Sequence, residues 1–415
     1  MRVIADLHIH SKYSRAVSKD MDLGHLDLWA GKKGITVMGT GDFTHPAWFK
    51  ELKEKLVPAE EGLYKLGQSG KTRFLLTVEI SNIYKKGGKV RKVHNIVLMP
   101  SLEAAEKFNA KLSLRGNLAS DGRPILGLDS KELLSIMLDV EPAAILIPAH
   151  AWTPWFSIFG SMSGFDSIEE CFDELTPHIK AIETGLSSDP AMNWRLSALD
   201  KVALVSNSDA HSPAKIGREA NVLKAELSYR GIVDAITSND PVKFLFTVEF
   251  FPEEGKYHYD GHRACEVSMK PAETKKLNLL CPGCGRRTTV GVLHRVEALA
   301  DRPEGHIKPN AVPFKSMIPL VEIIGDAFGV GPASKRVGEA YESLVGNLDS
   351  EFAILLEKPI SDIEKVADSA VAEAVRRVRE GKVEISPGYD GVYGKIRIFL
   401  SANDRTAAEN QTALF

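Results

Sequence analysis

Residues 3–11 read VIADLHIHS, a short apolar run followed at once by Asp6, His8 and His10. A run of this length between polar segments is typical of a buried strand. Carboxylate and imidazole groups, which are common metal ligands in proteins, come directly after it. The segment therefore predicts a strand whose C-terminal end carries candidate metal ligands.

The same placement recurs along the first 250 or so residues, where apolar runs alternate with longer mixed segments. This alternation predicts an α/β fold of repeated strand and helix units. The predicted strands cover residues 3–5, 35–38, 74–78, 96–99, 143–147, 180–182 and 202–205. Beyond the first strand, the candidate ligands at strand ends are Asp42 with His45, Glu79, His150, Glu183, and Asp209 with His211. In barrels of this kind the loops after the strands form the face where active sites lie.

His94 does not fit this placement because it precedes its apolar run. It would reach the site only if its strand ran in the opposite direction or belonged to a hairpin. A single His or Asp at a strand end is more often a turn or cap residue than a ligand. Several strands that share this placement favour one metal site instead.

The number and type of these ligands indicate the chemistry. Imidazole mixed with carboxylate suits transition ions such as Zn or Mn better than Ca or Mg alone, although Mg stays among the candidates. Two or three ions about 3.5 to 4 Å apart can bind phosphate oxygens, lower the pKa of a bridging water and stabilise the leaving oxygen. We therefore expect phosphate ester hydrolysis with two or three divalent cations (Zn, Mn or Mg).

Length and composition set broad limits. A chain of 415 residues is too long for one ordinary core, so we expect two or three domains. The net charge of -3 does not by itself indicate a polyanion partner. The N-terminus resembles neither a signal nor a transit peptide, and no apolar stretch is long enough to cross a bilayer, so we expect a cytoplasmic protein without a membrane partner.

Three of the four cysteines lie close together, which favours a metal site over disulfides. His262 and Cys265 form one pair, and Cys281 and Cys284 form a second pair fifteen residues later. This spacing predicts one structural zinc ion with four protein ligands. His258 could replace His262, but the two-residue spacer favours His262.

The distribution of residue types along the chain predicts four parts. They are the barrel (residues 1–249), the zinc-binding module (250–310), a mainly helical region (311–402) and a flexible tail (403–415). Within the helical region, Ser361 to Glu364 has the pattern of a capping box. An apolar stripe then runs from Ile363 to Val378 and ends before Gly381, which predicts one helix.

Over about the first 240 residues the order of motifs resembles the PHP (polymerase and histidinol phosphatase) superfamily. The matching motifs are DLHIHS (residues 6–11) with Ser14, the Asp42 region, Glu79, His94, His150 and DAH (residues 209–211). The resemblance implies a distorted (β/α)7 barrel in which His8, His10, Glu79 and Asp209 hold one ion, and Glu79, His94 and His150 a second.

It also implies that the Asp42 region and His211 contribute to a third ion, and that His10 and Asp209 are essential for catalysis. The superfamily commonly has Thr-Asp-His in its second motif, whereas here two residues separate Asp42 from His45. Either side chain could therefore be the ligand.

The whole chain resembles the endonuclease Q family of DNA-repair enzymes. The resemblance rests on TGDFTHP (residues 40–46), CPGCG (residues 281–285) and GVLHRVE (residues 291–297). It implies cleavage on the 5′ side of uracil, hypoxanthine, xanthine and abasic sites in damaged DNA, leaving 3′-hydroxyl and 5′-phosphate ends. A protein that acts on DNA in this way is expected to be associated with the nucleoid. The alternative is a small-molecule phosphatase of the histidinol-phosphatase type, which has no evident need for the zinc module.

Several further segments are candidates for binding DNA or a partner. Lys85, Lys86, Lys89 and Arg91 should lie on a basic hairpin, and Arg286 and Arg287 on the zinc module, where they contact phosphates or simply keep the surface solvated. Trp152 and Trp155 follow His150 and could stack a base or be buried. Gln411, Leu414 and Phe415 resemble a short peptide that docks into the replication sliding clamp.

Overall fold

The apolar run at the start of the chain forms strand β1 (Arg2–Asp6) of a large mixed sheet. In the computed structural model, which describes residues 1–399, β1 pairs in parallel with β2 (Val37–Gly39), and β2 pairs in parallel with β5 (Arg73–Lys86). On its other side, β1 pairs antiparallel with β11 (Ala220–Lys224). The first three predicted strands are thus neighbours, and their C-terminal ends lie at one edge.

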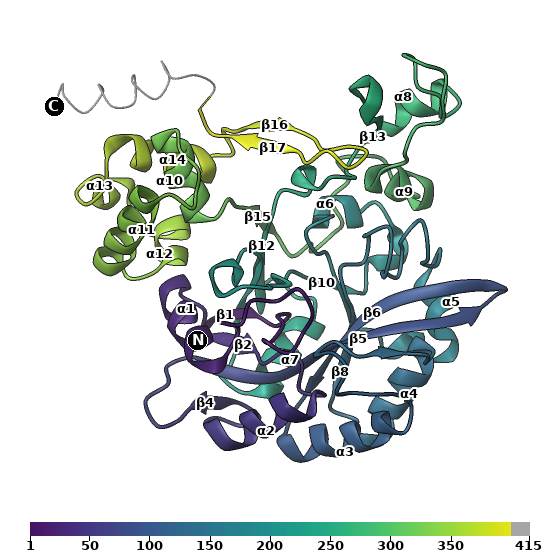
Figure 1. Ribbon diagram of the computed structural model, residues 1–415, viewed down its shortest axis with the longest axis vertical. Helices are drawn as coiled ribbons and strands as arrows, with labels where there is room; N and C mark the ends of the chain where they lie inside the picture. The colour runs from purple at the N-terminus through teal and green to yellow at the C-terminus, as the bar shows by residue number, and fades with distance from the viewer. Residues whose placement is uncertain (400–415) are drawn as a thin grey trace.

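A long hairpin follows, because β6 (Lys89–Met99) runs antiparallel to β5 along its whole length. Gly87 and Gly88 form its turn with φ angles of 59° and 74°, a left-handed conformation that glycine adopts without steric cost. The hairpin extends beyond the barrel (Figure 1). The reversed direction of β6 places His94 opposite Ser81, two residues beyond Glu79. The prediction that His94 reaches the site only from a hairpin or a reversed strand is thus confirmed.

The remaining strands close a distorted barrel. Strand β8 (Ile145–Pro148) pairs with β6, and β9 (Ala181–Glu183) lies beside β8 and pairs in parallel with β10 (Ala203–Val205). After β10, the Ser206 amide donates a hydrogen bond of 3.0 Å to Asn221 Oδ1 in β11. The expected barrel class is confirmed, with antiparallel β6 and β11 interrupting the parallel order.

Helices cover the outside of the barrel (Figure 1). The main ones are α1 (Leu23–Lys33), α2 (Pro46–Lys55), α3 (Leu102–Ser113), α4 (Ser130–Val140) and α7 (Tyr229–Thr237), with short α5 (Ile168–Phe172) and α6 (Pro190–Asn193). Each of the longer helices buries an apolar stripe, such as Leu133, Leu134 and Met137 of α4. Short strands β3 (Leu56–Pro58), β4 (Tyr64–Leu66) and β7 (Ile125–Leu126) pair with each other or with β5.

The sheet is extended by β12 (Phe244–Glu249), which pairs with β11 and with β15 (Phe314–Ser316). Between β12 and β15 the chain forms the cysteine-containing region, with β13 (Asp260–His262), β14 (Val267–Met269), α8 (Pro271–Lys276) and α9 (Val292–Leu299). The predicted boundary near 250 lies at the end of β12, whereas residues 314–316 return to the barrel sheet.

The helical region contains α10 (Leu320–Phe328), α11 (Lys335–Leu348), α12 (Glu351–Leu356), α13 (Ile360–Ile363) and α14 (Ser369–Arg379). The prediction of one helix starting at a capping box at Ser361 is wrong. Because Pro359 starts α13, Ser361 lies inside that helix, and a new helix begins after Asp368. Gly381, with φ of 68°, follows the last helix as predicted.

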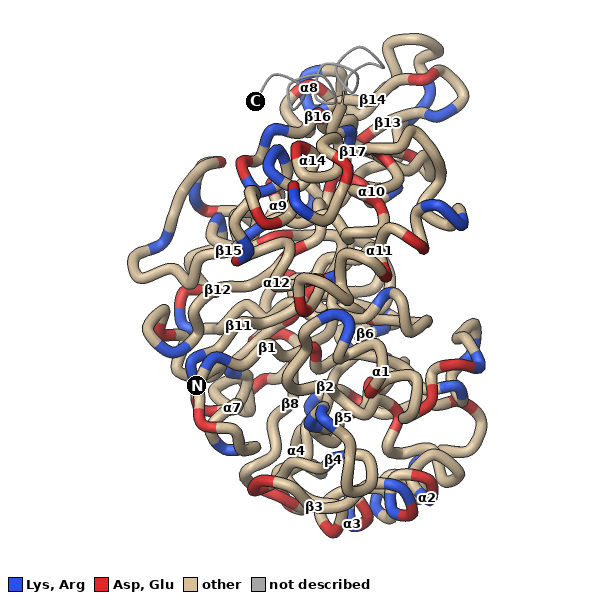
Figure 2. Tube along the Cα trace, turned by 90° about the vertical axis from the view of Figure 1, so that its left-hand side faces the viewer, with Lys and Arg blue, Asp and Glu red and all other residues tan. Residues whose placement is uncertain are grey.

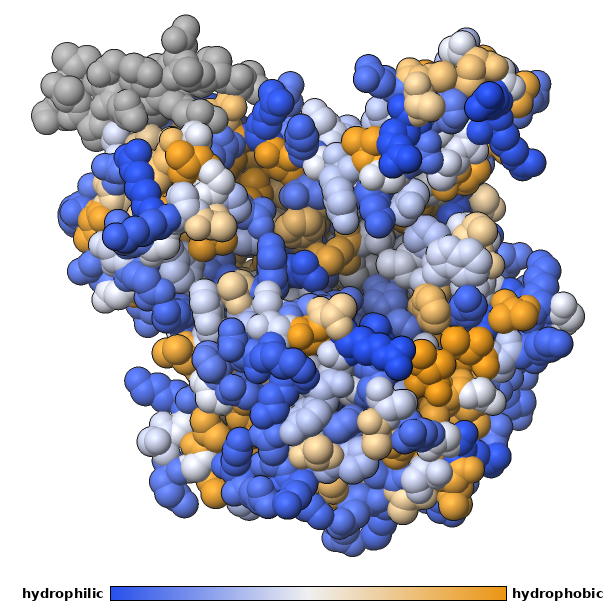
Figure 3. Space-filling view, viewed as in Figure 1, coloured by the Kyte–Doolittle hydropathy of each residue, from blue (hydrophilic) through white to orange (hydrophobic). Residues whose placement is uncertain are grey.

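After α14 the hairpin of β16 (Glu384–Ser386) and β17 (Lys395–Arg397) runs from the helical region to the cysteine-containing region. There the Tyr259 amide donates to the Gly388 carbonyl and the Arg263 amide to Asp390 Oδ2. Figure 3 shows the surface hollowed between these two regions, above the barrel.

No helix within residues 1–399 has the length and apolar character needed to cross a membrane. The clamp-like residues Gln411, Leu414 and Phe415 lie outside the described residues, so that assignment stays a prediction.

Candidate active site

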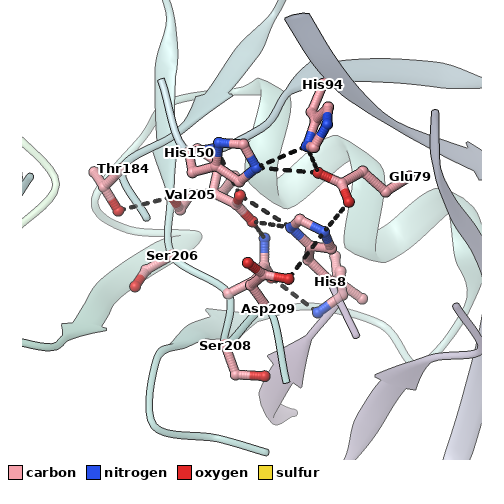
Figure 4. A network of polar contacts seen from close by, with 12 residues as sticks. His8, Glu79, His94, His150, Thr184, Val205, Ser206, Ser208 and Asp209 are labelled. Carbon is pink, nitrogen blue, oxygen red and sulfur yellow. Dashed lines mark hydrogen bonds and ion pairs between the residues drawn. The ribbon is translucent and has the colours of Figure 1, made fainter. Parts of the chain in front are cut away.

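Two groups of ligand atoms meet where the chain leaves β1, β8 and β10 and where the β5–β6 hairpin passes beside them (Figure 4). In the first, one atom from each of His8, His10, Glu79 and Asp209 lies within 4.8 Å of every other. In the second, the same holds for Glu79, His94 and His150. Glu79 belongs to both, so the two groups form one continuous cluster.

The cluster draws on five segments of chain. His8 and His10 follow β1 in extended backbone, where alternate side chains point to the same side. Glu79 and His94 come from the two strands of the long hairpin. His150 and Asp209 lie just after β8 and β10 and have positive φ angles of 29° and 46°, which are uncommon for residues with a side chain and concentrate at functional sites.

Neighbouring carboxylates orient the imidazoles. His8 Nδ1 lies 3.0 Å from Glu183 Oε2, which turns His8 Nε2 toward the cluster, where it is buried and has no hydrogen-bond partner. His10 Nδ1 lies 3.2 Å from Asp42 Oδ1, and its Nε2 lies 3.0 Å from Asp209 Oδ1. A partner on the second ring nitrogen is typical of histidines that bind a metal through the first.

Asp42 supports the cluster and does not join it. Its Oδ2 accepts hydrogen bonds from the Ser11 amide at 2.6 Å, the Ser11 hydroxyl at 2.7 Å and the Ser14 hydroxyl at 2.8 Å. Both carboxylate oxygens are therefore occupied by protein donors. Among residues 1–399, neither ligand group includes Asp42 or His211, so the expectation that they help to hold a third ion stays a prediction.

His45 and His211 lie beside the cluster. The His45 ring stacks on Tyr13 with ring centroids 4.5 Å apart, and it is absent from both ligand groups. His211 Nδ1 is 2.8 Å from the Asp209 carbonyl, and its ring packs at 4.7 Å against that of His10. Of the two candidate ligands in the second motif, Asp42 contacts the Nδ1 atom of His10, and His45 packs on the Tyr13 ring.

Opposite charges lie next to each other in the cluster and shift the pKa values of its side chains. Burial alone would lower the pKa of His8, but the carboxylates of Glu183 and Glu79 raise it well above the usual value. Burial likewise favours a neutral Glu79, yet His94 and Arg123 hold its pKa well below the usual value. A proton on His8 would occupy the position that a bound cation would take, because metal binding displaces ligand protons. His94 differs, since burial lowers its pKa to about 4.

Arg123 is a site residue that the sequence did not reveal. Its Nη1 lies 3.0 Å from Glu79 Oε2, and its side chain is partly exposed. It belongs to the loop before β7 and to no recognisable motif. Only the folded structure brings it to the cluster.

The residues present fit divalent ions. Both groups offer imidazole nitrogen and carboxylate oxygen, which suits transition ions. The buried Nε2 of His8 forms no hydrogen bond and faces the carboxylates of Glu79 and Asp209, as a ligand atom would. The sharing of Glu79 between the groups is the arrangement of a bridging carboxylate in a multi-metal site.

A second cluster lies in the cysteine-containing region. One ligand atom each from His262, Cys265, Cys281 and Cys284 lies within 4.8 Å of the others, and Cys284 Sγ is 3.5 Å from His262 Nδ1. His258 is not part of it: that ring is buried and stacks on Tyr259. The cluster contains four ligands and therefore has the composition of a closed structural zinc site.

The predicted DNA contacts separate into buried and exposed residues. Trp152 is only 1% exposed and donates a hydrogen bond to Asn193 Oδ1, so of the two alternatives for this residue the structure favours burial. Trp155 is 46% exposed. Lys86 binds Asp173 and Arg91 binds the Gly164 carbonyl, which fixes both side chains. The exposed basic residues are Lys85, Lys89, Arg286 and Arg287.

Known proteins share this architecture over nearly the full chain. The crystal structure of the lesion-specific endonuclease PfuEndoQ from Pyrococcus furiosus matches with a TM-score of 0.86 and 31% identity, over 98% of this chain and 99% of the other. A structure of endonuclease Q with a 27-mer duplex substrate carrying an abasic lesion at the active site matches with a TM-score of 0.84 and 32% identity, over 96% and 97%. The chain belongs to the endonuclease Q family. The resemblance noted in the sequence is thereby confirmed.

Relatives of this endonuclease Q family member occur in bacteria and archaea. The uncharacterized protein YqxK of Bacillus subtilis is 31% identical over 414 residues, covering 95% of this chain and 99% of that protein. The uncharacterized protein MJ0043 of Methanocaldococcus jannaschii is 34% identical over 255 residues, which cover 60% of this chain but only 31% of that longer protein. The family described as MJ0043 C-terminal domain matches residues 319–382.

Proposed function

We propose that the protein is a metal-dependent DNA-repair endonuclease. The observation that carries the proposal is the pair of ligand groups joined by Glu79, in a chain of the same family and architecture as a lesion-specific endonuclease. The related structure with an abasic lesion at its active site supports damaged duplex DNA as the substrate. We propose cleavage 5′ to uracil, hypoxanthine, xanthine and abasic sites, leaving 3′-hydroxyl and 5′-phosphate ends.

In this proposal two divalent ions (Zn, Mn or Mg) bind to the groups His8, His10, Glu79, Asp209 and Glu79, His94, His150. Bound ions of this kind polarise a phosphate and lower the pKa of a water molecule. Glu183 and Asp42 hold the His8 and His10 rings in place through their Nδ1 atoms. His262, Cys265, Cys281 and Cys284 bind one structural zinc ion.

Arg123 adds a positive charge beside the cluster. Its guanidinium is anchored by Glu79 and remains partly exposed, so it can donate a hydrogen bond to a phosphate oxygen held at the cluster. Fixed donors at the position where negative charge develops stabilise a transition state without reorganisation. We therefore assign Arg123 to phosphate binding.

The test uses labelled duplexes that carry one deoxyuridine, deoxyinosine or abasic site, incubated with Mn or Mg. Undamaged duplex and histidinol phosphate serve as controls. We expect a single nick immediately 5′ to the lesion, which a chelator and Asp209→Ala or His10→Ala abolish. Equal cutting of undamaged duplex would refute lesion specificity, and phosphate release from histidinol phosphate alone would favour the small-molecule phosphatase.

A further inference from the structure

A groove runs along one side of the long β5–β6 hairpin toward the active site. We call it the hairpin groove; it has a volume of about 1290 Å³ and is lined by the hairpin residues 86–92 without Gly88, by residues 160–166, and by Trp155, Glu170, Asp173 and Arg295. It starts near the hairpin turn and reaches Trp155, whose neighbour Phe156 packs against His94 with ring centroids 4.8 Å apart. The end of the groove at Trp155 therefore lies near the second ligand group, whose own residues do not line the groove.

The hairpin groove is positively charged, although the whole protein carries a net charge of -3. Five lysine and arginine side chains line it against three acidic ones. Asp166 is paired with Arg295 and Asp173 with Lys86, which neutralises two of the acids. On the side of the molecule shown in Figure 2, basic and acidic residues are interspersed. The excess positive charge of the groove is thus a local feature.

Two lysines of the groove are available to a ligand. Lys89 is exposed, and neither Lys89 nor Lys92 forms a salt bridge within residues 1–399. Lys92 Nζ lies 4.9 Å from the centre of the Trp155 ring, and it shares a strand with His94 two residues away. Lys92 and Trp155 together form a cationic and aromatic platform beside the metal ligands.

The spacing of these groups fits an extended polyanion. From His94 to Lys89 the strand covers five residues, or about 17 Å at roughly 3.4 Å per residue. One strand of a duplex rises about 3.4 Å per nucleotide along its axis, so Lys89 lies about five nucleotides from His94. The groove, whose lining on β6 ends at Lys92, covers the outer part of that distance. A small anion would need cations that converge on one point, whereas these are spread along a line.

We propose that the hairpin groove binds the sugar-phosphate backbone of the DNA duplex on one side of the cut, within about five nucleotides of it. Lys89 and Lys92 contact phosphates, and Trp155 packs at the nucleotide step next to the ligand cluster. Lys86 and Arg91, which are held by protein partners, shape the groove. The inference rests on the proposed function, because it takes DNA as the substrate.

The first test is the salt dependence of binding to undamaged duplex, measured by fluorescence anisotropy with the full-length protein. Each lost phosphate contact reduces the slope of log K against log salt by about 0.9. We expect Lys89→Gln and Lys92→Gln to reduce it by about 0.9 each, and the double variant by about 1.8. Lys71→Gln is the matched control, because Lys71 precedes β5 at the end of the strand remote from the hairpin turn. Unchanged slopes in the Lys89 and Lys92 variants would overturn the inference.

The second test locates the contact on one side of the lesion. Duplexes are trimmed to three base pairs on either the 5′ or the 3′ flank, and nicking is measured for each. We expect trimming of one flank alone to slow the wild type, and the double variant to be insensitive to trimming of that flank. Equal dependence on both flanks in wild type and variant contradicts the inference.

The two tests separate this inference from the proposed function. If both variants nick the lesion and keep the wild-type salt slope, DNA does not bind in the hairpin groove, while the proposed endonuclease activity stands. Reduced slopes in a protein that nicks no lesion support DNA in the groove and refute the repair activity. Trp155→Phe should retain nicking that Trp155→Ala loses, since an aromatic ring is what the platform supplies; equal nicking by the two variants contradicts that role.

Discussion

A buried ion pair joins the barrel to the helical region, and its disruption is a direct test of the fold. Lys33 Nζ at the end of α1 lies 2.7 Å from Glu351 Oε2 at the start of α12, and the two side chains are 2% and 5% exposed. Glu351 also accepts hydrogen bonds from the Tyr341 hydroxyl at 2.9 Å and the Leu320 amide at 3.0 Å. We predict that Lys33→Met strongly destabilises the protein.

The magnitude follows from burial. Removal of one partner of a buried pair typically costs about 3–5 kcal/mol, because the remaining charge is left without compensation. Glu351 keeps two hydrogen-bond donors, so we expect the lower end, about 3 kcal/mol. With a urea dependence of roughly 1.5–3 kcal/mol per molar, the unfolding midpoint should fall by about 1–2 M.

The assay is urea unfolding followed by circular dichroism and tryptophan fluorescence. Trp29 of α1 lies 6.2 Å from the Tyr341 ring and so contributes a signal from this interface. Lys33→Met with Glu351→Gln should recover most of the loss, since no charge remains buried. Lys32→Met is the control, because Lys32 pairs with the exposed Glu342 and should lose about 1 kcal/mol or less. A loss in Lys33→Met no larger than in this control would show that the Lys33–Glu351 pair stabilises the fold no more than an exposed pair does.

Three further predictions concern buried and clustered groups. Burial raises the pKa of Glu249 from 4.5 to about 8, so the protein is most stable at pH values below 4.5, the pKa in the unfolded chain, and loses stability as the pH rises toward 8. In thermal scans, Glu249→Gln should melt at the same temperature as wild type at pH 5 and at a higher temperature than wild type at pH 8.5. Cys281→Ser should lose the structural zinc while the barrel ions remain, as metal analysis would show, and an unchanged zinc content would argue against that site. Arg123→Met should reduce kcat for nicking more than it raises KM, and the reverse pattern would assign Arg123 to uniform substrate binding.

The positions of most barrel strands could be predicted because local sequence carries the signal. An apolar run followed by an Asp, Glu or His indicates a strand that carries a site residue: Asp6 ends β1, whereas Glu79 lies inside β5, which continues to Lys86. Strands β11 and β12 were not predicted. They pair with strands far away in the sequence, β11 with β1 and β12 with β15, and no local pattern encodes those partners.

The candidate site was predicted less completely than the fold. His94 reaches the cluster only because β6 runs antiparallel to β5, which its apolar run alone does not reveal. Asp42 has the residue type and position of a ligand, and the sequence does not show that its Oδ2 accepts hydrogen bonds from Ser11 and Ser14. Arg123 carries no motif and comes to Glu79 through tertiary structure alone.

Side-chain burial was the least predictable property. Trp152 and Trp155 are three residues apart in one aromatic loop, yet one is 1% and the other 46% exposed. Trp152 packs on Phe159 and binds Asn193, contacts that depend on a folded loop and on a distant helix. The single helix predicted from Ser361 is not formed. Apolar residues recur at helical spacing from Ile363 to Val378, but residues 364–368 between α13 and α14 are not helical, so the spacing alone could not locate the break.

If Glu79 joins two metal sites, its loss should empty both of them, and metal content shows this. Purified wild type, Glu79→Gln and His94→Ala are loaded with Mn and zinc, and bound metal is quantified by mass spectrometry alongside lesion nicking. We predict that Glu79→Gln loses both barrel ions and all nicking, that His94→Ala loses only one ion, and that both variants keep the structural zinc. Full barrel metal content in Glu79→Gln would contradict the account.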